Sequence, residues 1–159
     1  MLESDVYEYF KSNHIEYELV EHEAAYTIEE IEKMNISGFE YIVKNLFIRD
    51  DKKRHYYLIV VKKDTIVNMK ELQSKIKSRR LSFASESDLN KYLHLSHGEV
   101  TPLGIFNDES KSVEVIFDQN IPDIIGVHPL TNIKTVYLKT NDLIRIIKKH
   151  GNKISIVSI

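Results

Sequence analysis

The sequence predicts a mixed α+β domain, with a central, mostly antiparallel sheet flanked by helices. Apolar runs of strand length alternate along the chain with segments of helical periodicity, which is the first observation that supports this prediction. The second is that no repeat, low-complexity tract or Pro/Gly/Ser-rich linker divides the chain. The third is the length of 159 residues, which suits one folding unit, so we expect a single domain over residues 1–159.

Capping residues indicate where the helices begin. Ser, Thr and Asn accept hydrogen bonds from the free N–H groups of a first helical turn, and Thr27 is followed three residues later by Glu30, as in a capping box. We expect caps at Ser4, Thr27, Asn68, Ser85 and Asn141. The helices that follow are predicted over about residues 4–13, 27–34, 69–78, 88–95 and 142–150, the last ending at Gly151.

Strands are predicted where β-branched and aromatic residues gather. The segments "NLFIRD" and "HYYLIVV" lie on either side of the polar turn "DDKKR", which predicts a hairpin. The segment "SVEVIFD" alternates as a half-buried strand does. The predicted strands cover residues 17–22, 45–50, 55–61, 112–118, 134–140 and 153–159.

Composition excludes several classes of function. The net charge is −2, so no global positive field attracts nucleic acid, and any such contact needs a local patch. There is no Cys, which excludes a thiol nucleophile and thiolate metal sites. The acidic start "MLESDVYEYF" has no signal-peptide pattern, and no apolar run is long enough to cross a bilayer. We therefore expect a cytoplasmic protein that does not contact membranes.

Lys44 and Asn45 open an apolar strand, "KNLFI", in which a charge and an amide are unexpected. Lysine is rarely buried unless it is paired. One interpretation is a solvated strand end, and spacing alone favours it. The other is a site in which Lys44 holds an anion or stabilises developing negative charge, while Asn45 orients a carbonyl or hydroxyl group.

Two loops contain further candidates. "HGEVTPLGIFND" places Gly98 and Pro102 in one segment, where bare N–H groups can face an oxyanion; a plain turn is the alternative. In "GVHPLTN", His128 precedes Pro129 and is either a proton-transfer or hydrogen-bonding group or a packed histidine. No P-loop, dinucleotide fingerprint or HExxH zinc motif is present.

Basic residues gather in "KIKSRR", which has four cations in six positions, and in two shorter runs, "KK" at 62–63 and "KKHGNK" at 148–153. A solvated face is the simpler interpretation. The alternative is a patch that contacts a phosphate backbone, with specificity supplied elsewhere.

The order of these segments carries more information than any one of them. "VKNLFIRD", "HYYLIVV", "GEVTPLGIFND", "SVEVIFD", "GVHPLTN" and "NDLIRII" follow one another in an order that resembles the YbaK-like aminoacyl-tRNA editing domain. The resemblance runs from about Tyr17 to Ile159, and "EHEAAYTIEE" matches the early segment of the family. Within the family, the chain looks closest to the free-standing proteins that edit prolyl-tRNA.

The resemblance implies a trans-acting deacylase that cleaves the ester of a mischarged amino acid on the tRNA for proline, without metal or organic cofactor. It implies that the attacking water is activated by the vicinal hydroxyl of the terminal ribose. Lys44 falls on the essential lysine of the family, Gly98 on its glycine loop and His128 in its substrate pocket. We expect substrate contacts at Asn45, Thr101, Pro102, Asn107 and Pro129.

The resemblance leaves the amino acid open. Alanine is the expected one, removed by a pocket that excludes proline, with cysteine as the alternative. Glu23, where many relatives have Pro, and the run "LTNIKTV" depart from the family pattern and are expected to border the pocket. A non-catalytic sensor of aminoacyl-tRNA or amino acids is a second hypothesis, and an unrelated RNA-binding domain a third. The expected partner is the acceptor end of the tRNA for proline, with prolyl-tRNA synthetase as a further candidate.

Overall fold

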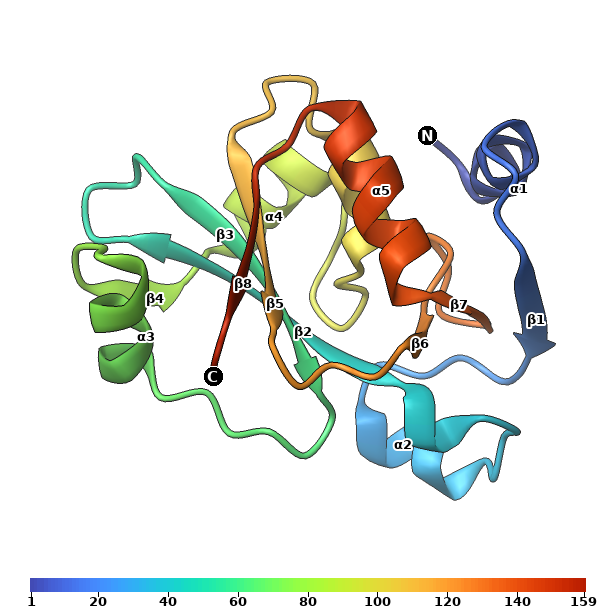
Figure 1. The fold of residues 1–159 in the computed structure, drawn as a ribbon. Helices are drawn as coiled ribbons and strands as arrows, with labels where there is room; N and C mark the ends of the chain where they lie inside the picture. Colours follow the sequence, from blue (N-terminus) through green and yellow to red (C-terminus); the bar gives the residue numbers. More distant parts are fainter.

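The computed structural model describes residues 1–159 and arranges eight strands in two sheets, with five α-helices packed around them (Figure 1). The larger sheet has five strands in the order β4-β2-β3-β5-β8. The strands β2 and β3 form the predicted antiparallel hairpin, and β3–β5 and β5–β8 pair in parallel. Its strands are β2 (Val43–Asp50), β3 (Tyr56–Lys62), β4 (Leu81–Phe83), β5 (Val113–Asp118) and β8 (Ile154–Val157).

The smaller sheet is antiparallel throughout and has the order β1-β7-β6. Its strands are β1 (Tyr17–Glu21), β6 (Ile124–Val127) and β7 (Lys134–Lys139). A single parallel bridge between Ile42 and Gly126 links the two sheets. The mixed, mostly antiparallel α+β class is therefore confirmed, but the strands divide into two sheets instead of one central sheet.

The helices match the predicted order and end within a few residues of the predicted positions. They are α1 (Glu3–Ser12), α2 (Ile28–Lys33), α3 (Met69–Ile76), α4 (Glu86–Leu93) and α5 (Thr140–His150), with short 3₁₀ helices η1 (Phe39–Tyr41) and η2 (Pro102–Asn107). Side chains cap three of the helices as predicted, from Thr27, Asn68 and Ser85. None of these helices has both the length and the apolar character needed to cross a bilayer.

Two predicted caps are wrong. Helix α1 begins after Leu2, whose N–H donates to the Asp5 carboxylate at 2.6 Å, so Ser4 lies within the first turn. Helix α5 begins at Thr140, directly after β7. The N–H group of Thr140 donates to Asp123 O at 2.8 Å, which ties the end of β7 to the loop before β6. Asn141 therefore lies inside the helix.

Apolar residues cover both faces of the larger sheet. Leu58 and Val60 of β3 belong to the main core, which includes residues of α4, η2, α5 and the smaller sheet. Ile59 and Val61, which alternate with them, pack with Leu72 of α3 on the other face. Because β3 is buried from both sides, it holds its hairpin partner β2 in a defined register, and β2 carries Lys44 and Asn45 at its first residues.

Candidate active site

A cavity of about 450 Å³ lies where the start of β2 meets α2, the Gly98 loop and the end of β6. Lys44, Asn45, Gly98 and His128 all line it. These residues come from three segments far apart in the sequence, so the fold brings four of the predicted site residues together.

Lys44 is half-buried at the cavity wall. Its ammonium group donates a hydrogen bond to the carbonyl oxygen of Thr65, in the loop between β3 and α3. This contact holds the cation without neutralising it, because the acceptor is an uncharged carbonyl. No carboxylate pairs with Lys44, so its ammonium group can contact an anionic or developing negative group in the cavity.

Asn45 joins β2 to the Gly98 loop. Its amide Nδ2 donates to the carbonyl oxygen of Val100 at 3.4 Å. Its Oδ1 is buried and has no hydrogen-bond partner in the protein. A buried acceptor left without a donor costs about 1–3 kcal/mol, so a substrate N–H or O–H that reaches it would recover that free energy.

Gly98 adopts a left-handed conformation with φ of 79°. A Cβ built at this position would lie 3.1 Å from both Cβ and O of Tyr26, so the loop packs its backbone directly against the residue before the Thr27 cap of α2. The N–H groups of Gly98 and Val100 have no acceptor within the protein. They are free to donate to an oxyanion.

Thr101 fastens the Gly98 loop to the end of β6. It is fully buried, and its hydroxyl donates to the carbonyl oxygen of His128 at 2.7 Å while accepting from Leu103 N–H at 3.3 Å. Pro102 and Pro129 are buried beside these contacts. None of these three predicted substrate-binding residues lines the cavity, so Thr101 positions the site from behind its wall.

Asn107 does not lie at the cavity, in contrast to the sequence prediction. It is at the far end of η2, where its Nδ2 donates to Leu93 O at 3.1 Å and its Oδ1 accepts from the N-terminal amine of Met1 at 2.9 Å. The amide nitrogen of Asn107 thus holds α4 and the amide oxygen holds the N-terminus. These two contacts account for a buried amide at the end of η2.

His128 presents one free ring nitrogen. Nδ1 lies 3.1 Å from the carbonyl oxygen of Lys134, which can only accept, so in the neutral ring Nδ1 carries the proton and Nε2 has the lone pair. Burial lowers the pKa of His128, against the opposing effect of the Lys134 carbonyl. The neutral form therefore predominates at pH 7, and Nε2 accepts a hydrogen bond from whatever occupies the cavity.

A small recess, with a volume of about 20 Å³, adjoins the main cavity. The two share the side chains of Ile31, Ile42, Val43, Asn45 and His128. A space of this size holds about one water molecule or a methyl group.

Several cavity residues were not expected from the sequence. Helix α2 contributes Glu29 and Ile31, and the loop after β3 contributes Lys63 and Asp64. The Thr27 cap predicted that α2 forms, but it gave no indication that α2 lies against the cavity. Conversely, Glu23 and the run after Pro129 were expected to border the pocket; neither Glu23 nor Ile133 lines the cavity, and of the run only Thr135 reaches the recess.

The cavity contains no serine or cysteine nucleophile. Its only aliphatic hydroxyl belongs to Thr27, which caps α2 by accepting from Glu30 N–H at 3.1 Å. Lysine side chains, free N–H groups and a neutral histidine, in a cavity without serine or cysteine, define a class of site that binds a carbonyl substrate and directs water to it.

Comparison with known proteins agrees with this class. The model of the aminoacyl-tRNA editing domain matches residues 22–146. The chain therefore belongs to the aminoacyl-tRNA editing domain family, and the predicted class, an aminoacyl-tRNA hydrolase, is confirmed.

The chain is also similar to individual known proteins. It is 49% identical to the prolyl-tRNA editing protein ProX of Acetoanaerobium sticklandii, over 91% of this chain and 90% of the relative. It is 32% identical to the prolyl-tRNA synthetase associated domain-containing protein 1 of Danio rerio, over 93% and 82% of the two chains. A crystal structure provisionally described as a trans-editing enzyme for prolyl-tRNA synthetase shares the fold, with a TM-score of 0.72 at 15% identity, over 99% and 96% of the chains.

The lowered pKa of His128 predicts a pH dependence of stability. The folded state favours the neutral ring, whereas the unfolded chain binds a proton below about pH 6.5. The free energy of unfolding should therefore fall as the pH drops below about 6.5. Chemical denaturation between pH 5 and pH 8 should show wild type losing stability relative to His128→Gln over this range. A difference between the two proteins that does not change with pH would contradict the assignment.

Proposed function

We propose that the chain is a trans-acting deacylase that hydrolyses the ester between alanine and the tRNA for proline. The observation that carries this proposal is the convergence of Lys44, Gly98 and His128 on a cavity that has no serine or cysteine nucleophile. The names of the relatives support the tRNA for proline as the substrate. On this proposal, residues 1–159 act as one editing domain in the cytoplasm, with prolyl-tRNA synthetase as a further partner.

Water supplies the nucleophile in the proposed reaction. Its oxygen adds to the ester carbonyl, the C–O bond to the ribose breaks, and the ribose oxygen takes up a proton, which leaves free alanine and intact tRNA. The N–H groups of Gly98 and Val100 stabilise the oxyanion, and one such donor is worth roughly 3–4 kcal/mol. Lys44 supports the same charge or holds the terminal nucleotide.

The vicinal hydroxyl of the terminal ribose lies beside the ester and orients the water in this mechanism. His128 Nε2 is an acceptor in the neutral ring, so it receives a hydrogen bond from that hydroxyl or from the water. Its role is to orient, because burial lowers its pKa and weakens it as a proton acceptor.

The recess supports alanine as the acyl group. Its volume of about 20 Å³ admits a methyl side chain and excludes the pyrrolidine ring of proline. Steric exclusion discriminates more strongly than added contacts, since one methylene is worth only about 1–3 kcal/mol in an apolar pocket. Cysteine is the second candidate, because its side chain exceeds a methyl group by a single sulfur atom.

The direct test follows loss of the ester from the tRNA for proline charged separately with alanine, cysteine, serine and proline. We expect the alanyl ester to be cleaved fastest and the prolyl ester to persist. Binding of alanyl-tRNA without turnover would instead favour a sensor that uses the same fold.

Lys44→Ala should lower kcat/KM for alanyl-tRNA by about a hundredfold or more, because it removes the lysine that β2 contributes to the cavity. Lys139→Ala, at the exposed last residue of β7, is the matched control and should leave the rate unchanged. Circular dichroism and thermal melting should show that both variants fold. Wild-type activity in folded Lys44→Ala would remove Lys44 from the mechanism.

Ile31→Val removes one methyl group from a wall of the recess, at a cost to stability of about 0.5–1.5 kcal/mol. We expect kcat/KM for 2-aminobutyryl-tRNA, which is one methylene longer, to rise about tenfold relative to alanyl-tRNA. Ile28→Val, which alters the main cavity but not the recess, is the control. Equal ratios in the two variants would show that the recess does not select the acyl group.

A further inference from the structure

A cluster of cations lies at the end of β2 away from the cavity. We call it the hairpin cluster, and it consists of Lys52, Lys53 and Arg54 in the β2–β3 turn together with Lys77, Arg79 and Arg80 after α3. All of these side chains are exposed. The two segments are more than 20 residues apart in the sequence, so the fold is what brings them together.

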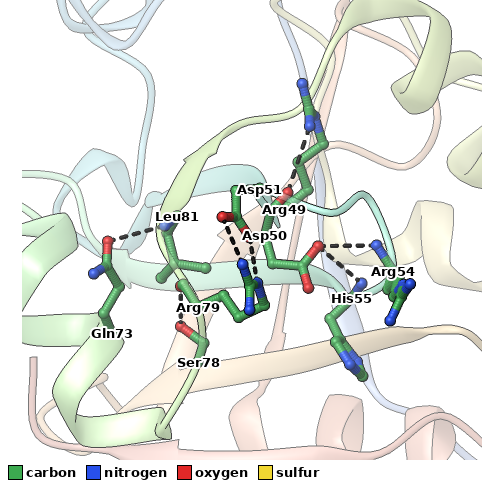
Figure 2. Close-up of polar contacts among 9 residues, drawn as sticks. All are labelled: Arg49, Asp50, Asp51, Arg54, His55, Gln73, Ser78, Arg79 and Leu81. Atoms are coloured by element: carbon green, nitrogen blue, oxygen red, sulfur yellow. Dashed lines mark hydrogen bonds and ion pairs between the residues drawn. The ribbon is translucent and has the colours of Figure 1, made fainter.

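Specific contacts hold the two segments against each other (Figure 2). The Arg79 guanidinium binds the Asp51 carboxylate through two hydrogen bonds, of 2.6 and 3.1 Å. Gln73 Oε1 accepts from Leu81 N–H at 2.9 Å and fixes the chain after α3. The cluster is therefore a defined surface, although each of its side chains is free to move.

The turn itself is fixed by a buried carboxylate. Asp50 is fully buried, and its Oδ1 accepts from Arg54 N–H at 2.9 Å and from His55 N–H at 3.4 Å. These are backbone donors, so the Arg54 side chain takes no part and remains free. Figure 2 shows the Arg54 side chain directed away from Asp50.

The cluster keeps most of its charge. Arg79 is its only member that forms an ion pair with a carboxylate. The whole chain nevertheless has a net charge of −2, so the remainder of the molecule is acidic and the cluster is a local positive pole. A polyanion is attracted to such a pole.

We infer that the hairpin cluster binds the phosphate backbone of the tRNA acceptor arm while the aminoacylated end occupies the cavity. This inference rests on the proposed deacylase function. The cluster and Lys44 are at opposite ends of β2, about 20 Å apart for six residues of strand. Exposed Lys62 and Lys70 lie along the segment that leads from the cavity to α3. In this arrangement the cavity recognises the aminoacyl ester, and the cluster supplies affinity for the tRNA backbone that does not depend on its sequence.

The test compares two substrates with a triple variant, Lys52→Gln, Arg54→Gln and Arg80→Gln. None of these three side chains forms a hydrogen bond or ion pair in the protein, so the fold should be unaffected. We expect KM for alanyl-tRNA to rise about tenfold or more at low salt, with kcat unchanged. Hydrolysis of alanyl-adenosine, which has no phosphate backbone, should keep its wild-type rate.

The control is a second triple variant, Lys11→Gln, Lys139→Gln and Lys148→Gln, on α1, β7 and α5. It has the same net charge as the first variant, so it separates the local patch from overall electrostatic attraction. We expect its KM to stay within about twofold of wild type. Equal losses in the two variants, or a matching loss on alanyl-adenosine, would overturn the inference.

Binding of uncharged tRNA for proline, measured by fluorescence anisotropy across a salt series, tests the cluster without any reaction. The slope of log affinity against log salt should become shallower by up to about 3 in the hairpin-cluster variant and remain unchanged in the control. An unchanged slope would overturn the inference. A protein that binds tRNA through the cluster but cleaves neither ester would instead contradict the deacylase function.

Discussion

Two hydrogen bonds hold the site together. Thr101 donates to His128 O at 2.7 Å, and Asn45 donates to Val100 O at 3.4 Å. Together they tie the larger sheet, the Gly98 loop and the end of the smaller sheet around one cavity. Without them the free N–H groups of the loop would have no defined position relative to Lys44. The two sheets also share the main apolar core and a backbone bridge between Ile42 and Gly126.

The cavity combines fixed donors with a lysine, and in the proposed mechanism water is the nucleophile. Its cation is held by the Thr65 carbonyl, its oxyanion donors are backbone groups, and its histidine is kept neutral by burial. Groups that are already oriented need no reorganisation as charge develops on the carbonyl oxygen. Such a site suits an ester, which water attacks more readily than it attacks an amide.

The proposed account divides recognition between two places. In this account the recess beside His128 selects the acyl group by its size. The hairpin cluster, at the other end of β2, supplies attraction for the phosphate backbone. Because β3 is buried on both faces and pairs along most of β2, the two places are joined by a rigid strand. A fixed distance between the recess and the cluster would favour a ligand in which the ester and the helical phosphates are the same distance apart.

Local chemistry explains what the sequence could predict. The β2–β3 hairpin follows from a polar turn between two apolar runs, and the helix caps at Thr27, Asn68 and Ser85 follow from side chains next to free N–H groups. The strands β4 and β6 were missed because they have only three and four residues, and β6 contains Gly126.

Long-range contacts explain what the sequence could not predict. The grouping of Lys44, Gly98 and His128 was expected only from the resemblance to a family, since spacing alone favoured a solvated strand end. Thr101 supports the site through a hydrogen bond to His128, which is 27 residues away in the sequence. Asn107 is held by the N-terminal amine of Met1, which is 106 residues away. No local sequence pattern encodes either contact.

The central claim is that this cavity cleaves the ester with water oriented by the substrate's own hydroxyl. The most direct measurement compares single-turnover hydrolysis of alanyl-tRNA for proline with that of the same tRNA ending in a deoxyadenosine that lacks the vicinal hydroxyl. The account predicts rapid hydrolysis of the natural substrate and a loss of about a hundredfold or more for the deoxy form, with binding retained. Equal rates for the two would contradict it and would require a catalytic group from the protein.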